Sequence, residues 1–168
     1  MKKFCLDTSG FSNPHEQMPE DVPHYGPIWD SVISAICAGK IGVTREIYDE
    51  LCHVTGKVGE CIRDNKALLL LEVGDASWDS LSYLRNFNRM RKDHAEWIAE
   101  YAMKSPARTI TLPDLSSIAL AKTLALPLVH MESSSNGSPR HKRIPDICAI
   151  ESVLPYSFND FLKHEAKS

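Results

Sequence analysis

The stretch LPDLSSIALAKTLALPLVHM, residues 112–131, contains the two kinds of element from which the fold is predicted. Residues 112–126 are apolar around almost the whole helical circumference, which indicates a buried helix. Residues 126–131 then form a short apolar run that predicts a strand. A buried helix that leads directly into a buried strand is typical of a parallel sheet with helices on both faces.

The same alternation recurs along the rest of the chain. Short apolar runs predict strands over 3–6, 41–43 and 68–73. Helical patterns cover 28–40, 45–54, 77–90, 93–103 and a terminal segment from about 157. We therefore expect a single α/β domain over residues 1–168, a three-layer α/β/α sandwich around a mostly parallel sheet of about five strands.

Two segments interrupt this pattern. A proline-rich insert near residues 12–27 has little periodicity, so it is predicted to be a loop. The stretch ESSSNGSPRHKR, residues 132–143, is rich in serine and is predicted to be a mobile loop.

The composition narrows the class of protein. An apolar share of 43% in 168 residues provides for one domain with a real core. No apolar run reaches the ~20 residues of a membrane span, and no apolar segment follows the basic start as in a signal peptide. The five cysteines are scattered without a CxxC pair, which indicates reduced thiols in a cytoplasmic protein. A net charge of −3 argues mildly against nucleic-acid binding by bulk electrostatics.

Acidic residues follow the predicted strands. Asp7 ends the first strand, Asp114 opens the buried helix, Glu132 follows the strand over 126–131, and Asp146 comes after Pro145. Ligands of such sheets gather at the carboxyl ends of the strands, so these side chains are candidate site residues. Each also has an ordinary structural interpretation, as a turn residue, a helix cap or an exposed loop acid.

Glu50 adds a fifth candidate. On the helix after Thr44, the apolar face contains Ile47 and Leu51, and Glu50 is expected within that face. Asp49 is expected on the opposite side. Because no basic residue shares the face of Glu50, its carboxylate is expected to have another partner.

Several carboxylates at one edge of a sheet, without Arg or Lys among them, would repel one another. A hard divalent cation with oxygen ligands removes that repulsion. The pattern thus predicts a Mg²⁺ or Mn²⁺ site, where metal-bound water hydrolyses a phosphodiester. Glycine-rich phosphate loops are absent, and an aspartyl phosphatase would ordinarily have a second Asp where Ser9 stands.

These acids resemble those of the PIN-domain ribonucleases, the fold of the VapC-type toxins. The segment LDTS at 6–9 resembles the strand that supplies the first acid, here Asp7. Glu50 with Leu51 matches the second acid, and Asp114 in the buried helix matches the third. Residues 26–51, 112–132 and 142–148 further resemble a PIN-like branch of uncharacterised function, the DUF4411 type.

The resemblance implies a PIN-like domain and a function. It implies an endoribonuclease that depends on Mg²⁺ or Mn²⁺, cleaves RNA and acts as the toxin of a toxin–antitoxin pair, with an antitoxin and a second copy of the chain as partners. The ligands would be Asp7, Glu50, Asp114 and a fourth acid. The family's usual Thr-Asn-Asp at the fourth position is His130-Met131-Glu132 here, so Glu132 and Asp146 both stay candidates.

Further roles follow from the chemistry of neighbouring residues. Thr8 and Ser9 could orient Asp7 or a metal-bound water, or could be ordinary turn hydroxyls. Arg140, Lys142 and Arg143 could contact the RNA backbone, or could keep the loop soluble. The alternative to an enzyme is a PIN-like module that binds RNA or protein with weak or no catalysis.

Overall fold

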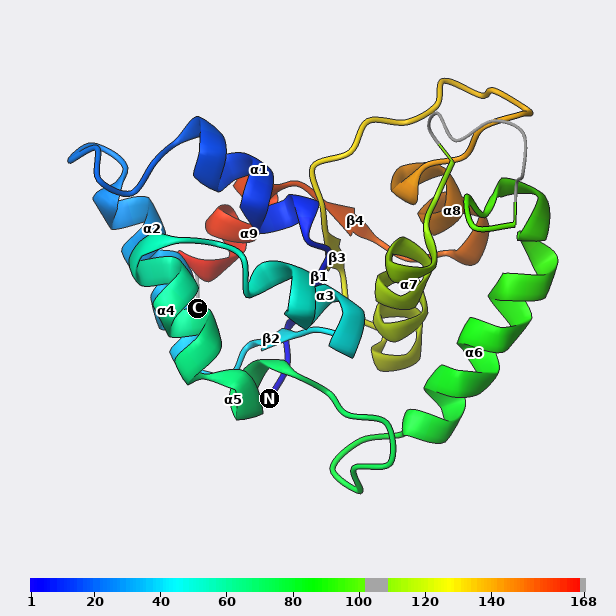
Figure 1. Cartoon of the computed structure of the whole chain (residues 1–168), viewed down its shortest axis with the longest axis horizontal. Coiled ribbons are helices and arrows are strands. Elements are labelled where there is room, and N and C mark those ends of the chain that lie inside the picture. Colours follow the sequence, from blue (N-terminus) through cyan, green and yellow to red (C-terminus); the bar gives the residue numbers. More distant parts are fainter. Residues whose placement is uncertain (102–108, 167–168) are drawn as a thin grey trace.

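A short parallel sheet with helices on both faces forms the centre of the molecule (Figure 1). The computed structural model describes residues 1–101 and 109–166. Within these residues the sheet has four strands in the order β2-β1-β3-β4, all parallel: β1 (Phe4–Leu6), β2 (Ile41–Gly42), β3 (Leu128–Val129) and β4 (Pro155–Tyr156). The predicted α/β class is confirmed, and the strand count is four rather than five.

Strand β1 lies inside the sheet and is buried on both faces. Phe4 and Leu6 belong to one apolar core, whereas Cys5 between them belongs to the other. The neighbouring strand β3 divides in the same way, with Val129 in the first core and Leu128 in the second. This alternation follows from the period of two residues along a strand, and it accounts for the continuously apolar runs in the sequence.

The first core lies under the helices on the left of Figure 1. The helices that cover this core are α1 (Ser9–Gln17), α2 (Gly26–Cys37), α3 (Arg45–Leu51), α4 (Gly56–Asp64), α5 (Lys66–Leu69) and α9 (Phe158–Glu165). Aromatic rings hold the first and last of them together: the Phe11 ring contacts Phe158 and Phe161 edge-on, at centroid distances of 6.1 and 5.6 Å.

The second core lies under the helices on the right of Figure 1. They are α6 (Ser80–Asp93), η1 (Ala95–Trp97), α7 (Leu112–Leu124) and α8 (Ile144–Glu151). Helix α7 is buried continuously over 115–121, as its apolar circumference predicts. It ends at Ala125 in the left-handed conformation and leads into β3.

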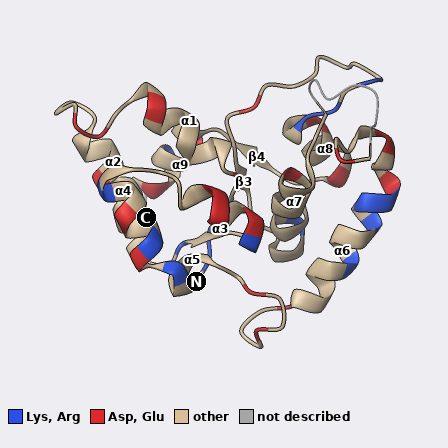
Figure 2. Cartoon of the chain, viewed as in Figure 1, with Lys and Arg blue, Asp and Glu red and all other residues tan. Residues whose placement is uncertain are grey.

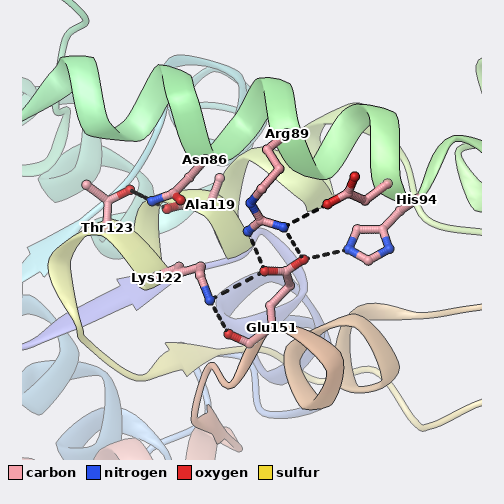
Figure 3. A network of polar contacts seen from close by, with 8 residues as sticks. Asn86, Arg89, His94, Ala119, Lys122, Thr123 and Glu151 are labelled. Atoms are coloured by element: carbon pink, nitrogen blue, oxygen red, sulfur yellow. Dashed lines mark hydrogen bonds and ion pairs between the residues drawn. The ribbon is translucent and has the colours of Figure 1, made fainter.

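An ion-pair network joins the three long elements of this layer (Figure 3). The buried carboxylate of Glu151 in α8 accepts two hydrogen bonds from Arg89 of α6, at 3.1 and 2.6 Å. His94 Nε2 lies 2.7 Å from the same carboxylate, and Lys122 of α7 donates to the Glu151 carbonyl at 2.6 Å. Helix α6 carries several Lys and Arg residues (Figure 2), and the ion pair with Glu151 gives one of them, Arg89, a structural role.

Several local predictions were wrong. Residues 68–73 form no strand: Leu68 and Leu69 end α5, and Leu70 pairs with Val43 through a single bridge. The insert is not all loop, because α1 continues to Gln17 and includes Pro14. The predicted helix over 93–103 is one short 3₁₀ turn, and its last two residues lie outside the described part of the chain. Among the described residues, every helix is too short or too polar to cross a membrane.

Candidate active site

Asp7 lies at the carboxyl end of β1, where the chain turns into α1. Its side chain is 3% exposed. One carboxylate oxygen, Oδ2, accepts hydrogen bonds from the Ser9 N–H at 3.0 Å and the Ser9 hydroxyl at 2.6 Å. The other oxygen, Oδ1, is buried and has no hydrogen-bond partner among the described residues. Because burial of an unpaired carboxylate oxygen is unfavourable, this atom marks Asp7 as a candidate ligand.

Ser9 also ties Asp7 to the next strand. Its hydroxyl oxygen accepts a hydrogen bond from the Met131 N–H at 3.2 Å, just beyond β3. Gly10 makes this close approach sterically feasible, since a Cβ at that position would lie 2.6 Å from the carbonyl oxygen of Val129. The turn after β1 therefore needs both a small residue and a hydroxyl to hold Asp7 beside the end of β3.

Asp114 is held at the start of α7 by a capping box. Its carboxylate accepts from the Thr111 N–H at 2.8 Å, and its own N–H donates to the Thr111 hydroxyl at 3.2 Å. This arrangement stabilises the first turn of a helix. The capping interpretation of Asp114 is therefore confirmed, and its location leaves it electrostatically coupled to Asp7 as well.

The two aspartates have strongly raised pKa values. Burial raises the pKa of Asp7 to about 6, and repulsion from Glu132 and Glu50 contributes in the same direction, against the hydrogen bonds from Ser9. Burial and repulsion from Asp7 and Glu132 raise the pKa of Asp114 to about 7, despite its bonds to Thr111. One electrostatic cluster, the acid cluster, therefore contains the carboxylates of Asp7, Glu50, Asp114 and Glu132. Its negative charges repel one another.

Glu50 is exposed, so the expectation that it lies on the inward face of its helix was wrong. The buried residues of α3 are Ile47, Tyr48 and Leu51. The Glu50 carboxylate nevertheless reaches toward the site, because it accepts a hydrogen bond from the hydroxyl of Thr8. Thr8 and Ser9 therefore contact different acids, and neither is only a turn residue.

The two candidates for the fourth acid differ in their surroundings. Glu132 accepts one hydrogen bond, from the Ile144 N–H at 3.3 Å, and its charge acts on Asp7 and Asp114. Asp146 instead caps α8. Burial raises its pKa, but hydrogen bonds reverse the shift, so the pKa of Asp146 is lowered overall. The donors are the Arg143 N–H, the Ser134 hydroxyl and the Ser135 N–H.

The carboxylates do not converge on a single point. Within residues 1–101 and 109–166, no three Asp, Glu, His or Cys side chains lie close enough together to form a metal-binding group. Each outer acid is turned toward its own hydrogen-bond donor, Thr8 for Glu50 and Ile144 for Glu132. In the same part of the chain, no Lys or Arg forms an ion pair with any of the four acids.

Two cavities lie beside the outer acids. One of about 320 Å³ is lined by Glu50 together with residues of α1 and of the segment over 53–55. The other, of about 380 Å³, is lined by Glu132, His130 and Tyr156 among others. The acid cluster is therefore flanked by space on the side of α3 and on the side of β4.

His130 is a residue that sequence reasoning treated only as a departure from a family pattern. Its ring is buried, and burial lowers its pKa, which favours the neutral imidazole. Nδ1 accepts a hydrogen bond from the Glu132 N–H at 3.2 Å, whereas Nε2 has no partner among the described residues. The sequence gives no sign of this hydrogen bond, because its donor is a backbone N–H rather than a recognisable side chain.

The three basic residues of the loop over 132–143 have different environments. Arg140 is exposed. Lys142 lies over the Trp97 ring, 5.5 Å from its centroid. Arg143 precedes α8 and donates through Nη1 to the Ser133 carbonyl at 3.4 Å. The loop is thus fastened to η1 and to α8, and Arg140 is its most exposed cation.

The fold and the acid cluster define an α/β protein with a candidate site at the carboxyl edge of a parallel sheet. The family model described as "Domain of unknown function (DUF4411)" matches residues 4–168, and the chain belongs to this family. The crystal structure of PAE2754 from Pyrobaculum aerophilum is similar, with a TM-score of 0.50 and 12% sequence identity over 99% of this chain and 91% of that one. At that identity the likeness shows the fold alone. A search of curated protein sequences gives no significant match.

Proposed function

We propose that the chain is a PIN-like, divalent-metal-dependent ribonuclease that hydrolyses RNA phosphodiester bonds at the Asp7–Asp114 cluster. The observation that carries the proposal is the buried, unpartnered Oδ1 of Asp7 beside a second aspartate, Asp114, whose pKa is raised by burial and by repulsion from Asp7. A turn residue and a helix cap do not require two buried carboxylates that repel each other, so the pair indicates a functional site.

The donor set fits Mg²⁺ or Mn²⁺. All four groups are carboxylates, which are the hard oxygen ligands that these cations prefer. Asp7 and Asp114 would hold the cation, and Glu50 and Glu132 would turn from Thr8 and Ile144 to complete the set. A bound divalent ion in such a site supplies an activated water and stabilises the leaving oxygen. The hydroxyls of Thr8 and Ser9 would orient the acids that they contact.

The surroundings of the cluster support a polymeric substrate. The two flanking cavities provide space on both sides of the acids, as a strand with nucleotides on either side of the cleaved phosphate requires. Arg140 would contact the RNA backbone from the loop. If it does so together with Lys142 and Arg143, neutralising all three should flatten the salt dependence of binding by up to ~0.7 per lost contact. If the slope is unchanged in a binding titration with single-stranded RNA, these three basic residues only keep the loop soluble.

The decisive experiment compares two acidic substitutions. Asp7→Asn removes the charge of the central acid while keeping its shape, so we expect it to abolish Mn²⁺-dependent cleavage of labelled single-stranded RNA. Asp49→Asn is the matched control, because Asp49 is exposed on α3 next to Glu50 and belongs to no part of the cluster. Circular dichroism confirms that both variants are folded.

Two outcomes would overturn the proposal. Equal loss of cleavage in the Asp49 and Asp7 variants would show that the cluster is not the source of activity. Binding of RNA without cleavage, unchanged by Asp7→Asn and by EDTA, would favour the binding module. The toxin role, the antitoxin and the homodimer that the resemblance implies stay predictions.

A further inference from the structure

Two cysteine thiols lie side by side on the face of the molecule formed by α2 and α4. Cys37 is the last residue of α2, and Cys61 lies in α4. Their sulfur atoms are 3.8 Å apart although the residues are 24 positions apart in sequence. Neither belongs to the acid cluster, and Cys37 and Cys61 are both free thiols.

The two thiols are unequal in their access to solvent. Cys37 is exposed, whereas Cys61 is 9% exposed. Burial and the neighbouring Cys37 raise the pKa of Cys61 to about 11, while the Asn65 side-chain amide, 3.5 Å from its sulfur, acts in the opposite direction. An exposed thiol beside a shielded one is the arrangement in which the first reacts with a reagent and the second resolves the product.

We propose that Cys37 and Cys61 form a modification site, at which a small disulfide such as glutathione disulfide converts the pair into an intramolecular disulfide between α2 and α4. Such a bond would close the segment over 37–61, which contains β2 and α3 with Glu50. The site is independent of the proposed nuclease function.

The chemistry proceeds by two exchanges. The Cys37 thiol loses its proton, and its sulfur attacks one sulfur of glutathione disulfide, forming a mixed disulfide and releasing one glutathione thiol. The Cys61 thiol then loses its proton, and its sulfur attacks Cys37 Sγ, expelling the second glutathione thiol. The protein loses two hydrogens and two electrons, and the glutathione disulfide that gains them is the oxidant.

The full-length protein is incubated with glutathione disulfide and examined by intact-mass spectrometry and thiol counting under native and denaturing conditions. We expect wild type to go from five free thiols to three without retaining glutathione. Its melting temperature should rise by roughly 10 °C, because the bond restricts the unfolded chain. In Cys61→Ser, the resolving thiol is absent, so glutathione should stay attached to Cys37.

Cys52→Ser is the matched control, since Cys52 is partly exposed and lies on the same side of the molecule but has Tyr48 as its neighbour. It should form the internal disulfide as wild type does. Wild type that retains glutathione on Cys37 just as Cys61→Ser does would overturn the proposal, because Cys61 would then be unable to reach the mixed disulfide. So would a wild type that keeps all five thiols.

Discussion

Replacing Asp114 by Asn should stabilise the metal-free protein at alkaline pH. The pKa of Asp114 is raised from 3.8 to about 7 in the folded chain, so the folded state binds this proton more tightly than the unfolded state. Stability from this group is therefore greatest at low pH and is lost as the pH rises from about 4 to about 7. Raising the pH from 5 to 8 ionises Asp114 and should lower the free energy of unfolding of wild type by about 2–3 kcal/mol. The Asn variant should not show this loss, because its side chain does not ionise.

The assay is urea unfolding followed by circular dichroism in EDTA at pH 5 and pH 8. Asp146→Asn is the matched control, because Asp146 occupies the third position of a capping box in α8 as Asp114 does in α7. The pKa of Asp146 is lowered rather than raised. The control should therefore lose about 1 kcal/mol at pH 8, in line with the loss of a helix cap.

The two variants should consequently move in opposite directions at pH 8. A loss of stability in Asp114→Asn equal to that in Asp146→Asn would refute the reasoning, because it would make Asp114 a helix cap without electrostatic strain. Millimolar Mn²⁺ provides a second reading. It should raise the free energy of unfolding of wild type by ~2.7 kcal/mol at a hundredfold excess over Kd, and that of Asp114→Asn by much less.

Two further substitutions test the scaffold around the site. Against the effect of burial, hydrogen bonds from Arg89 and His94 lower the pKa of Glu151 from 4.5 to about 2, so its stabilising contribution is present at neutral pH and is lost as the pH falls from about 4.5 to about 2. Glu151→Gln should lower the free energy of unfolding by roughly 2 kcal/mol at pH 7 and by clearly less at pH 3. The figure allows for screening by water around the partly exposed Arg89. Equal losses at both pH values in urea titrations would contradict the ion-pair interpretation. Gly10→Ala should cost about 1–3 kcal/mol in the same assay, because its Cβ meets the Val129 carbonyl at 2.6 Å. Gly26→Ala, where the added Cβ meets nothing within 4 Å, is the control, and similar losses in both variants would show that the turn after β1 is not tightly packed.

The buried helix and its strand were predictable because their signal is local. Helix α7 is apolar around its circumference, and the run that follows is short and bounded by Pro127. Once these elements are assigned to a parallel sheet, the chain positions of Asp7 and Asp114 place both at the carboxyl edge. That inference needs no knowledge of the other contacts in the fold.

The errors arose where distant contacts decide the local structure. Helix α1 forms around Pro14 because Phe11 packs against rings of α9, nearly the whole chain away. Strand β4 is two residues long and begins with Pro155, so no alternation could reveal it. For Glu50, helical periodicity gives the direction of a side chain but not its depth, and the hydroxyl of Thr8 that it meets comes from another element.

The order of the strands also has a consequence for how the chain folds. Strand β1 precedes its partner β3 by more than a hundred residues, with Cys5 opposite Leu128. Pairing over such a separation closes a long loop and is expected to be slow. Asp7 and Asp114 approach each other when α7 packs against β1, so their repulsion acts on a long-range step of assembly. A chain that grows from its N-terminus would therefore keep the two acids apart until α7 has been made.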